Sequence, residues 1–181
     1  MNPSASTVDH ALSAAAAAEL SAAAGGDRDA LAAIVDAYHG DMVRVAHVIC
    51  GDVEITADAV QSAWLKIATS LGSVREPSRL RAWLCSVAAN EARQARRRRR
   101  PTVSLDAIAG AHAEASDRSA EFVDMTIAVN RLATRDRELL ALRYVAGFSS
   151  AELADHFDLT AAGVRSRLKR LLDRLRMELN L

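Results

Sequence analysis

Arginine and lysine side chains are concentrated in two blocks of this sequence, although the 181-residue chain balances 23 basic residues against 23 acidic ones. Residues 79–100 contain eight arginines and one acidic residue, Glu91. Residues 161–176 contain six basic residues and one acidic residue, Asp173. Guanidinium and ammonium groups bind phosphate oxygens, and blocks of them are typical of proteins that bind polyanions. Two such blocks favour two nucleic-acid surfaces over the alternative that each is only a solvated helix face.

The second block follows a pattern typical of a helix-turn-helix. Ser149 and Glu152 form a capping box at the start of a short helix that reaches about Phe157. Asp158 tolerates the left-handed backbone of a turn, and Thr160 can cap a longer helix after it. In this motif the second helix enters the major groove of duplex DNA.

Helical periodicity divides the side chains of that second helix between two faces. Val164 and the leucines that follow it are expected to point inward, which leaves the basic residues between them outside. The small Ala161 and Ala162 at the start of the helix allow a close approach to DNA. The outward side chains that can meet phosphates or base edges are Arg165, Arg167, Lys169 and Arg170.

The elements that must position these surfaces are predicted to be helices. Alanine is abundant and aromatic residues are few, a balance that suits helices better than sheets. We therefore predict an all-α fold of two small helical domains joined by a flexible linker, with the helix-turn-helix in the second domain. The predicted divisions are an Ala-rich N-terminal extension (1–26), a first domain (27–100), a linker (101–120) and a second domain (121–181).

Four helices are predicted in the first domain. Asp27 can cap the first helix, which is expected to end at Gly40, and a second helix follows until Gly51 breaks the chain. The other two are expected over about residues 55–71 and 79–100, with the arginines gathered at the exposed end of the last helix. The N-terminal extension is interpreted as a mobile appendage.

Composition and motifs exclude several classes of protein. No apolar run approaches the roughly 20 residues that span a bilayer, and acidic residues interrupt the Ala-rich start, unlike a signal peptide. Cys50 and Cys85 stand alone without the spacing of metal ligands, which indicates a reducing cytoplasm. The histidines share no spacing with cysteines or carboxylates, and no catalytic motif is present. We therefore expect no metal, no cofactor and no enzyme activity.

The order of these features resembles a bacterial RNA polymerase sigma factor of the extracytoplasmic-function (ECF) subfamily of the sigma-70 family. In the first half, the resemblance rests on Asp58-Ala59-Val60-Gln61 with Trp64 and Lys66, and on "RAWLCSVAAN" (81–90) with Arg97. In the second half, it rests on "RDRELLALRYVAGFSSAELADHF" (135–157) and "VRSRLKRLLDRLR" (164–176). The resemblance extends over residues of about 28 to 100 and 122 to 178, which is essentially everything but the N-terminal extension and the linker.

The resemblance implies a non-enzymatic initiation factor whose first domain grips core polymerase and opens the −10 promoter element, and whose second domain reads the −35 element as a duplex. The implied partners are core RNA polymerase (the β′ clamp helices and the β flap), promoter DNA and an anti-sigma factor. The residues implied to bind core polymerase are Asp58, Gln61, Trp64 and Lys66. Those expected at −10 DNA are Trp83, Asn90, Arg93, Arg96 and Arg97, and those expected at −35 DNA are Thr160, Ala161, Arg165, Ser166, Arg167, Lys169 and Arg170.

Other interpretations of the residues stay open. A dimeric helix-turn-helix regulator could occupy an operator without touching polymerase, and a helical adaptor or enzyme could use the basic faces for RNA or acidic proteins. The run of five arginines could be a polybasic anchor for a membrane or RNA. Trp64 and Trp83 lie at helical spacing among apolar residues, so both could be core residues, although Trp83 could also stack on an unpaired base.

Overall fold

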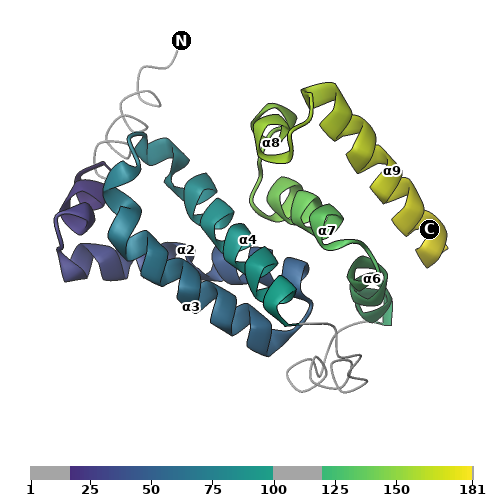
Figure 1. Cartoon of the computed structure of the whole chain (residues 1–181), viewed down its shortest axis with the longest axis horizontal. Helices are drawn as coiled ribbons and strands as arrows, with labels where there is room; N and C mark the ends of the chain where they lie inside the picture. Colours follow the sequence, from purple (N-terminus) through teal and green to yellow (C-terminus); the bar gives the residue numbers. More distant parts are fainter. Residues whose placement is uncertain (1–16, 100–119, 181) are drawn as a thin grey trace, which may run out of the picture.

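The computed structural model describes residues 17–99 and 120–180, and every regular element in them is a helix. The first domain contains α2 (Arg28–Cys50), α3 (Val53–Ser70), the turns η1 (Leu71–Ser73) and η2 (Pro77–Arg79), and α4 (Leu80–Arg98). The second contains α6 (Ala120–Asn130), α7 (Thr134–Leu140), the π-helical turn η3 (Ala141–Val145), α8 (Ser150–Phe157) and α9 (Ala161–Leu179). The two groups of helices lie side by side (Figure 1), which confirms the predicted all-α, two-domain fold. All but the last residue of the predicted linker lies outside the described residues.

Aspartate side chains begin the two long helices of the first domain. Asp27 caps α2 by accepting hydrogen bonds from the backbone N–H groups of Asp29 (2.9 Å) and Ala30 (3.1 Å). Asp52 caps α3 in the same way and accepts a bond of 2.8 Å from the N–H of Ile55. Such caps satisfy backbone donors that have no partner within the helix. α2 begins after Asp27, as the sequence predicts, whereas α3 begins at Val53, two residues before the predicted start.

One predicted boundary in the first domain is wrong. α2 runs through Gly40 without a break, where the sequence favoured the end of one helix and the start of another. A glycine inside a helix costs only about 1 kcal/mol relative to alanine. Ile34 and Met42, on either side of it, are both buried. Their packing outweighs the cost, and Gly40 itself is exposed.

Part of the N-terminal extension is packed against the first domain. Residues 17–24 are helical, and Leu20 and Ala23 are buried in the same apolar cluster as Ile67 and Leu71. The interpretation of the extension as a mobile appendage is therefore wrong for these residues. Residues 1–16 lie outside the described part of the chain.

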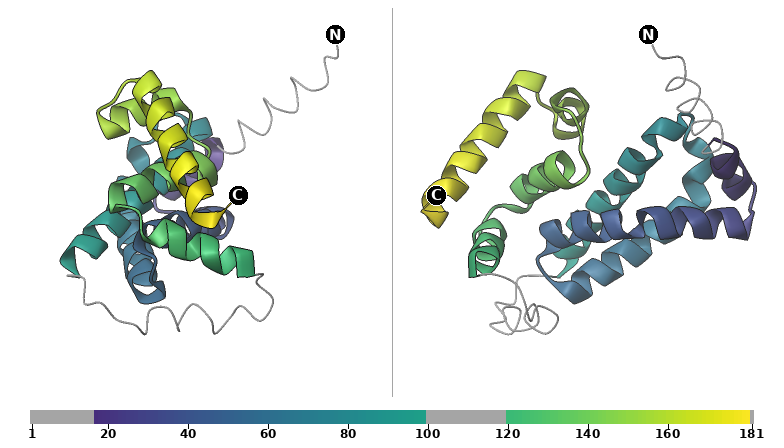
Figure 2. Two further views of the ribbon diagram at one scale, coloured as in Figure 1. Left: turned by 90° about the vertical axis from the view of Figure 1, so that its right-hand side faces the viewer. Right: turned by 180° about the vertical axis from the view of Figure 1, so that it is seen from behind.

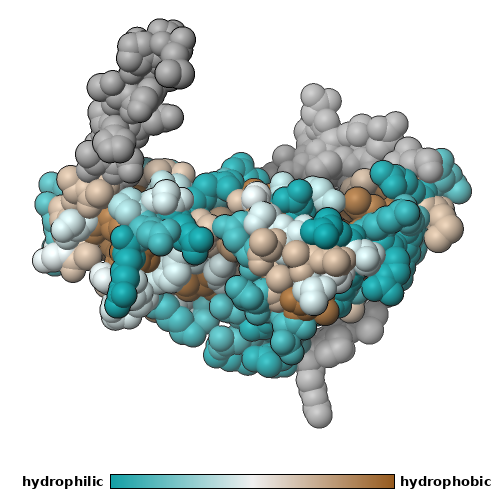
Figure 3. Space-filling model, turned by 90° about the horizontal axis from the view of Figure 1, so that it is seen from above, coloured by the Kyte–Doolittle hydropathy of each residue, from teal (hydrophilic) through white to brown (hydrophobic). Residues whose placement is uncertain are grey.

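The two domains share one apolar core. The shared cluster combines Val45 and Ile49 of α2 with Leu139 of α7, Leu142 of η3 and Val164 of α9. α2 packs against α7 and η3, and the rear view in Figure 2 shows the end of α2 beside the second domain. On the face drawn in Figure 3, hydrophobic residues form only patches between hydrophilic ones, as expected when most apolar side chains are inside.

Within residues 17–99 and 120–180, no helix combines the length and the apolar character that crossing a membrane requires. Cys50 and Cys85 are both buried free thiols.

Candidate nucleic-acid interface

The predicted helix-turn-helix is present, with the expected local chemistry. Ser149 Oγ accepts a hydrogen bond from the backbone N–H of Glu152 (3.2 Å), and a Glu152 carboxylate oxygen accepts one from the N–H of Ser149 (2.8 Å). Asp158 adopts the left-handed turn conformation with φ of 54°, and the side chain of Thr160 caps α9 by accepting from Gly163 N–H (3.0 Å). α8 and α9 are thereby held against each other as the two helices of the motif.

α9 has a buried apolar face and an exposed basic face, as its periodicity predicts. Val164, Leu168, Leu171 and Leu175 are buried against the rest of the second domain. α9 lies at the outer edge of the molecule in Figure 1, so its exposed face is accessible along its length. The exposed residues from the predicted −35 set are Thr160, Arg165, Ser166, Lys169 and Arg170, and Ala161 is half-buried at the start of the helix.

Arg167 differs from the other basic residues of α9. Its side chain is half-buried, and two of its nitrogens, Nε and Nη2, contact the same carboxylate oxygen of Asp136 on α7, at 2.8 Å and 2.7 Å. Arg167 therefore ties α9 to α7 in this structure, and its guanidinium does not extend from the outer face with those of its neighbours.

The predicted −10 residues lie along α4, but most of them are already engaged. Arg93 Nη2 donates to Asn90 Oδ1 (2.9 Å), and its Nη1 lies 3.3 Å and 3.4 Å from the two carboxylate oxygens of Glu138 in the second domain. Arg96 donates to the backbone carbonyl of Cys50, the last residue of α2. Arg97, by contrast, is exposed.

Glu138 is the centre of a buried charged cluster that sequence reasoning missed. Its side chain is 0% exposed. Besides its contact with Arg93, it accepts one hydrogen bond from Arg135 (2.9 Å) and contacts His156 Nε2 (2.9 Å). Burial alone would raise the pKa of this carboxyl, but the bonds from His156 and Arg135 and the charge of Arg93 hold its pKa below the usual value. A signal was present, because Glu138 lies four residues before the buried Leu142 and thus on the buried side of its helix.

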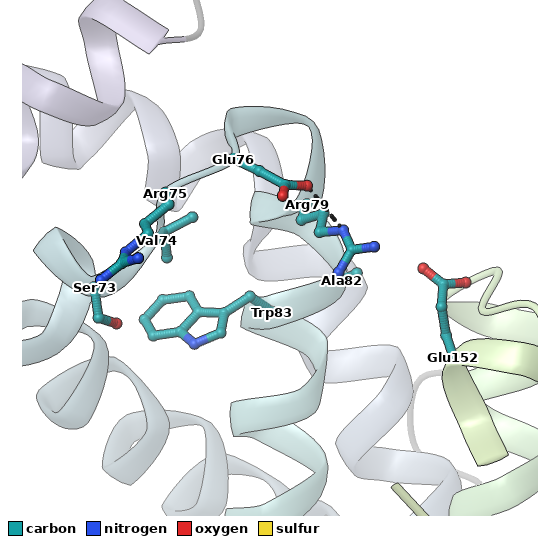
Figure 4. Close-up of a pocket in the computed structure, with 8 residues that line it drawn as sticks. All are labelled: Ser73, Val74, Arg75, Glu76, Arg79, Ala82, Trp83 and Glu152. Atoms are coloured by element: carbon teal, nitrogen blue, oxygen red, sulfur yellow. Dashed lines mark ion pairs between the residues drawn. The ribbon is translucent and has the colours of Figure 1, made fainter. Parts of the chain in front are cut away.

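Trp83 lines an open pocket of about 350 Å³ at the N-terminal part of α4. Figure 4 shows the indole ring beneath the loop that carries Arg75 and Glu76, with Arg79 above it and Glu152 of α8 on the opposite side. Trp83 is half-buried, with part of its surface against the core of the first domain. The ring therefore packs inward, as one of the two interpretations expects, and it also lines a pocket, whereas its stacking on an unpaired base stays a prediction.

The predicted polymerase-binding residues lie on α3 and differ in exposure. Asp58 and Gln61 are exposed on one face of α3, whereas Trp64 is half-buried and donates from its indole N–H to His39 Nδ1 (3.1 Å). Lys66 is exposed but bridges to the buried carboxylate of Glu91 on α4. Leu65, which sequence reasoning did not single out, is 69% exposed and lies one turn beyond Gln61.

This arrangement defines a two-domain helical protein with a C-terminal helix-turn-helix, a class that includes many DNA-binding transcription factors. Comparison with protein families identifies the particular family within this class. Residues 34–102 match the family model described as Sigma-70 region 2, and residues 126–175 match Sigma-70, region 4. The chain belongs to the sigma-70 family of RNA polymerase sigma factors and is of the ECF type.

Two curated relatives carry names that agree with this family. The chain is 31% identical over 172 residues to the probable RNA polymerase sigma factor RfaY of Xanthomonas campestris, and the alignment covers 89% of this chain and 43% of RfaY. It is 23% identical over 170 residues to the ECF RNA polymerase sigma factor SigW of Bacillus subtilis, covering 85% of this chain and 91% of SigW. The chain therefore spans less than half the length of RfaY but most of the length of SigW.

Two solved structures have a similar fold. CnrH, in complex with the cytosolic domain of CnrY, matches with a TM-score of 0.66 at 24% identity, over 90% of this chain and 95% of that one. The sigma factor RpoE of Bartonella quintana, in complex with the anti-sigma factor NepR, matches with a TM-score of 0.63 at 23% identity, over 77% of this chain and 90% of that one. These similarities confirm the two-domain helical fold.

Proposed function

We propose that this chain binds core RNA polymerase and directs transcription initiation at specific promoters, by recognising their −10 and −35 elements and helping to melt the DNA. The observation that carries the proposal is the presence of region 2 and region 4 matches, in that order, on two helical domains that each bear a basic surface. The chain itself breaks no covalent bond in this proposal, because the chemistry of RNA synthesis belongs to the polymerase. Its place of action would be the cytoplasm.

Reading of the −35 element is assigned to α9. A helix with an outward row of arginine, lysine and serine side chains fits the major groove, where such side chains meet base edges and phosphates. The exposure of Arg165, Ser166, Lys169 and Arg170 supports this role. Thr160 and Ala161 lie at the N-terminal end of α9, where backbone N–H groups and the helix dipole favour a phosphate.

Binding of the −10 strand is assigned to α4 and the Trp83 pocket. Single-stranded DNA binds to basic grooves that also offer aromatic surfaces, and base stacking on an aromatic side chain contributes about 1–3 kcal/mol per base. The Trp83 pocket has an indole ring on one side and Arg75 and Arg79 nearby. Asn90, Arg93, Arg96 and Arg97 follow Trp83 along the same helix and would hold the backbone of the strand.

Contact with core polymerase is assigned to the exposed face of α3. Asp58, Gln61 and Leu65 lie at positions that share one side of the helix, and all three are exposed. An exposed leucine between polar residues is the composition expected of an interface centre with a polar rim. The β′ clamp helices are the proposed partner of this face, and Trp64 and Lys66 on the same helix are proposed to contribute to the contact. The β flap is the proposed partner of the second domain.

An anti-sigma factor is proposed as a regulatory partner. The solved structure of RpoE contains such a partner, NepR, and this chain has the same fold. A protein that covers α3 or the basic faces would prevent contact with polymerase or DNA.

Run-off transcription tests the proposal. Purified core polymerase would be incubated with a pool of bacterial promoter fragments, with and without this protein. We expect transcripts that begin at discrete sites only when the protein is present. Duplex binding without core binding or start-site selection would instead favour the dimeric operator-binding regulator.

A further inference from the structure

We propose that Gln94 of α4 reads an adenine of the unpaired −10 strand, and that Glu91 and Arg98 hold its side-chain amide in the orientation that this base requires. The inference rests on the proposed role of α4 in −10 binding. It deepens that role, because arginines that contact phosphates position a strand but do not read its sequence. Gln94 would be a specificity-determining residue and Glu91 a positioning residue, and neither belongs to the set predicted for −10 DNA.

Gln94 lies on the face of α4 that is assigned to the strand. It follows Asn90 by four residues and precedes the exposed Arg97 by three, and side chains at this spacing share one side of a helix. Gln94 is half-buried, so its motion is restricted while part of it stays accessible. An uncharged amide among arginines is thus placed where it can meet a base while its neighbours hold phosphates.

Two charged neighbours on α4 select one orientation of this amide. Gln94 Nε2 donates to Glu91 Oε1 at 3.3 Å, and Gln94 Oε1 accepts from Arg98 Nη2 at 3.3 Å. The reversed amide would point its oxygen at a carboxylate and its N–H groups at a guanidinium, and neither pair can form a hydrogen bond. Both bonds are longer than the usual length of about 2.9–3.0 Å, so the amide can still adjust when a base binds.

Glu91 can orient the amide because its own carboxylate is fixed. Its side chain is 4% exposed, and Lys66 Nζ of α3 lies 2.5 Å from Oε1, the same oxygen that accepts from Gln94. α3 and α4 pack side by side (Figure 1). Glu91 is the only acidic residue in the basic block 79–100, and its charge is paired with that of Lys66. It therefore positions Gln94 and does little to repel the phosphates of the strand.

The bonds to Glu91 and Arg98 leave part of the Gln94 amide available for a base. A primary amide has two N–H donors and two lone pairs on its oxygen, so one donor and one acceptor remain. A base that uses both must present an acceptor beside a donor. Adenine does so with N7 and its N6 amino group, the two atoms that glutamine contacts when it recognises adenine in duplex DNA. An unpaired adenine also presents N1 beside the same amino group, which makes adenine the expected base.

Run-off transcription from a promoter library with a randomised −10 region tests the inference, using the complete protein with core polymerase. Sequencing the templates that yield transcripts gives the base preference at each position. With the wild type, we expect adenine to be enriched about tenfold at one position, as for a bidentate contact. Gln94→Ala should lose this enrichment and keep the preferences at other positions. The absence of an adenine preference, or one that Gln94→Ala leaves unchanged, would overturn the inference.

Glu91→Met tests the positioning role separately. Methionine has a similar length and accepts no bond from Gln94, while Lys66, whose side chain is 55% exposed, can be solvated instead. The adenine enrichment should fall at least about twofold, because the amide would then occupy both of its orientations. A loss of stability alone would lower the yield from all templates alike and leave the ratio of bases unchanged. An adenine enrichment equal to that of the wild type would overturn the positioning role of Glu91.

Arg97→Gln is the matched control on the same face of α4. Arg97 is exposed and would hold a phosphate, so its loss should lower transcription from every template without changing the adenine enrichment. Failure of the proposed function has a different signature. If no template yields more transcript than with core polymerase alone, the proposed function fails and the inference fails with it. Transcripts at discrete sites without an adenine preference that depends on Gln94 would overturn the inference alone.

Discussion

Asn130, the last residue of α6, lies so close to Gly51, the residue that ends α2, that a β-carbon at position 51 would be 2.2 Å from Asn130 Oδ1. Gly51 also has a φ of 68°, in the left-handed region that side chains disfavour. The two residues come from different domains. Glycine at this position therefore serves both the turn between α2 and α3 and the approach of the second domain.

The first prediction is that Gly51→Ala destabilises the protein partly through Asn130. The left-handed backbone should cost about 1–2 kcal/mol with alanine, and the contact with Asn130 should add to it. In an Asn130→Ala background the contact with Asn130 is absent, and the backbone term and a contact of 3.1 Å with Arg137 Nη1 remain, so the effect of Gly51→Ala should shrink by about 1 kcal/mol. Urea unfolding of the two single variants and the double variant measures this coupling, and strictly additive effects would contradict the contact.

The second prediction concerns the buried charge of Arg137. Burial lowers the pKa of its guanidinium to about 10, and two of its nitrogens lack partners among the described residues. Methionine of similar length should leave the free energy of unfolding unchanged or raise it by about 1–4 kcal/mol, as seen when buried ions are replaced by apolar residues. Chemical denaturation of Arg137→Met provides the measurement.

Arg135→Met is the matched control for this prediction. Arg135 bonds to Glu138 (2.9 Å) and to the carbonyl of His156 (2.9 Å), and its guanidinium lies 4.2 Å from the centre of the Phe157 ring. Its loss leaves Glu138 with Arg93 and His156 as partners and should destabilise the protein by about 1–3 kcal/mol. If Arg137→Met were as damaging as Arg135→Met, Arg137 would have a partner that the described residues do not contain.

The local rules of sequence reasoning located most elements but not the contacts between domains. The caps at Asp27 and Thr160, the capping box of Ser149 and the left-handed turn at Asp158 depend on residues within four positions of one another. Arg93 and Glu138 are 45 positions apart, and no periodicity links them. The same limit explains why the ion pair of Arg167 was not predicted. A helical wheel of α9 places Arg167 outward, but it contains no information about Asp136, which lies on a neighbouring helix.

The third prediction is a dependence of stability on acid pH through Glu138. Its pKa lies below the ordinary 4.5, so the folded protein binds the proton less readily than the unfolded chain does. The resulting stability is complete above about pH 5 and is lost as the pH falls through the folded pKa. Glu138→Gln removes this contribution, so its stability should fall less steeply below pH 4.5 than that of the wild type.

The acid slope of Glu138→Gln should be reduced without vanishing. The pKa of Asp41 is also lowered, because its bonds to Arg81 and Arg44 outweigh the opposing effect of burial, and it titrates in the same window. Urea midpoints measured between pH 6 and pH 3 test the comparison. Parallel curves for the wild type and Glu138→Gln would show that Glu138 is not held in its charged form.

The fourth prediction is that neither native cysteine reacts in the folded protein. Burial raises the pKa of both Cys50 and Cys85 to about 11, which leaves fewer than about one thiol in a thousand ionised at pH 7.5. Ellman's reagent should therefore find no rapidly reacting thiol in the native protein and two after unfolding in guanidinium chloride. A fast native thiol would reveal local opening around that cysteine.

The fifth prediction separates the roles of basic residues on α9. Arg165 is exposed near the start of the helix, and Arg174 is exposed nine residues later, about two and a half turns along and on the opposite side of the helix. The two variants to alanine therefore remove the same charge from different positions on α9. If Arg165 reads a base edge, its loss should reduce affinity for the cognate −35 duplex by about 1–3 kcal/mol and relax the choice of base at one position. If it contacts only a phosphate, affinity should fall uniformly across sequences, and the slope of log affinity against log salt should decrease by about 0.9.

Duplexes selected by start-site mapping, titrated at several salt concentrations, distinguish the two cases, and Arg174→Ala should change neither the base preference nor the slope. An Arg165→Ala protein that matches the Arg174→Ala protein in both measurements would remove the start of α9 from the −35 contact.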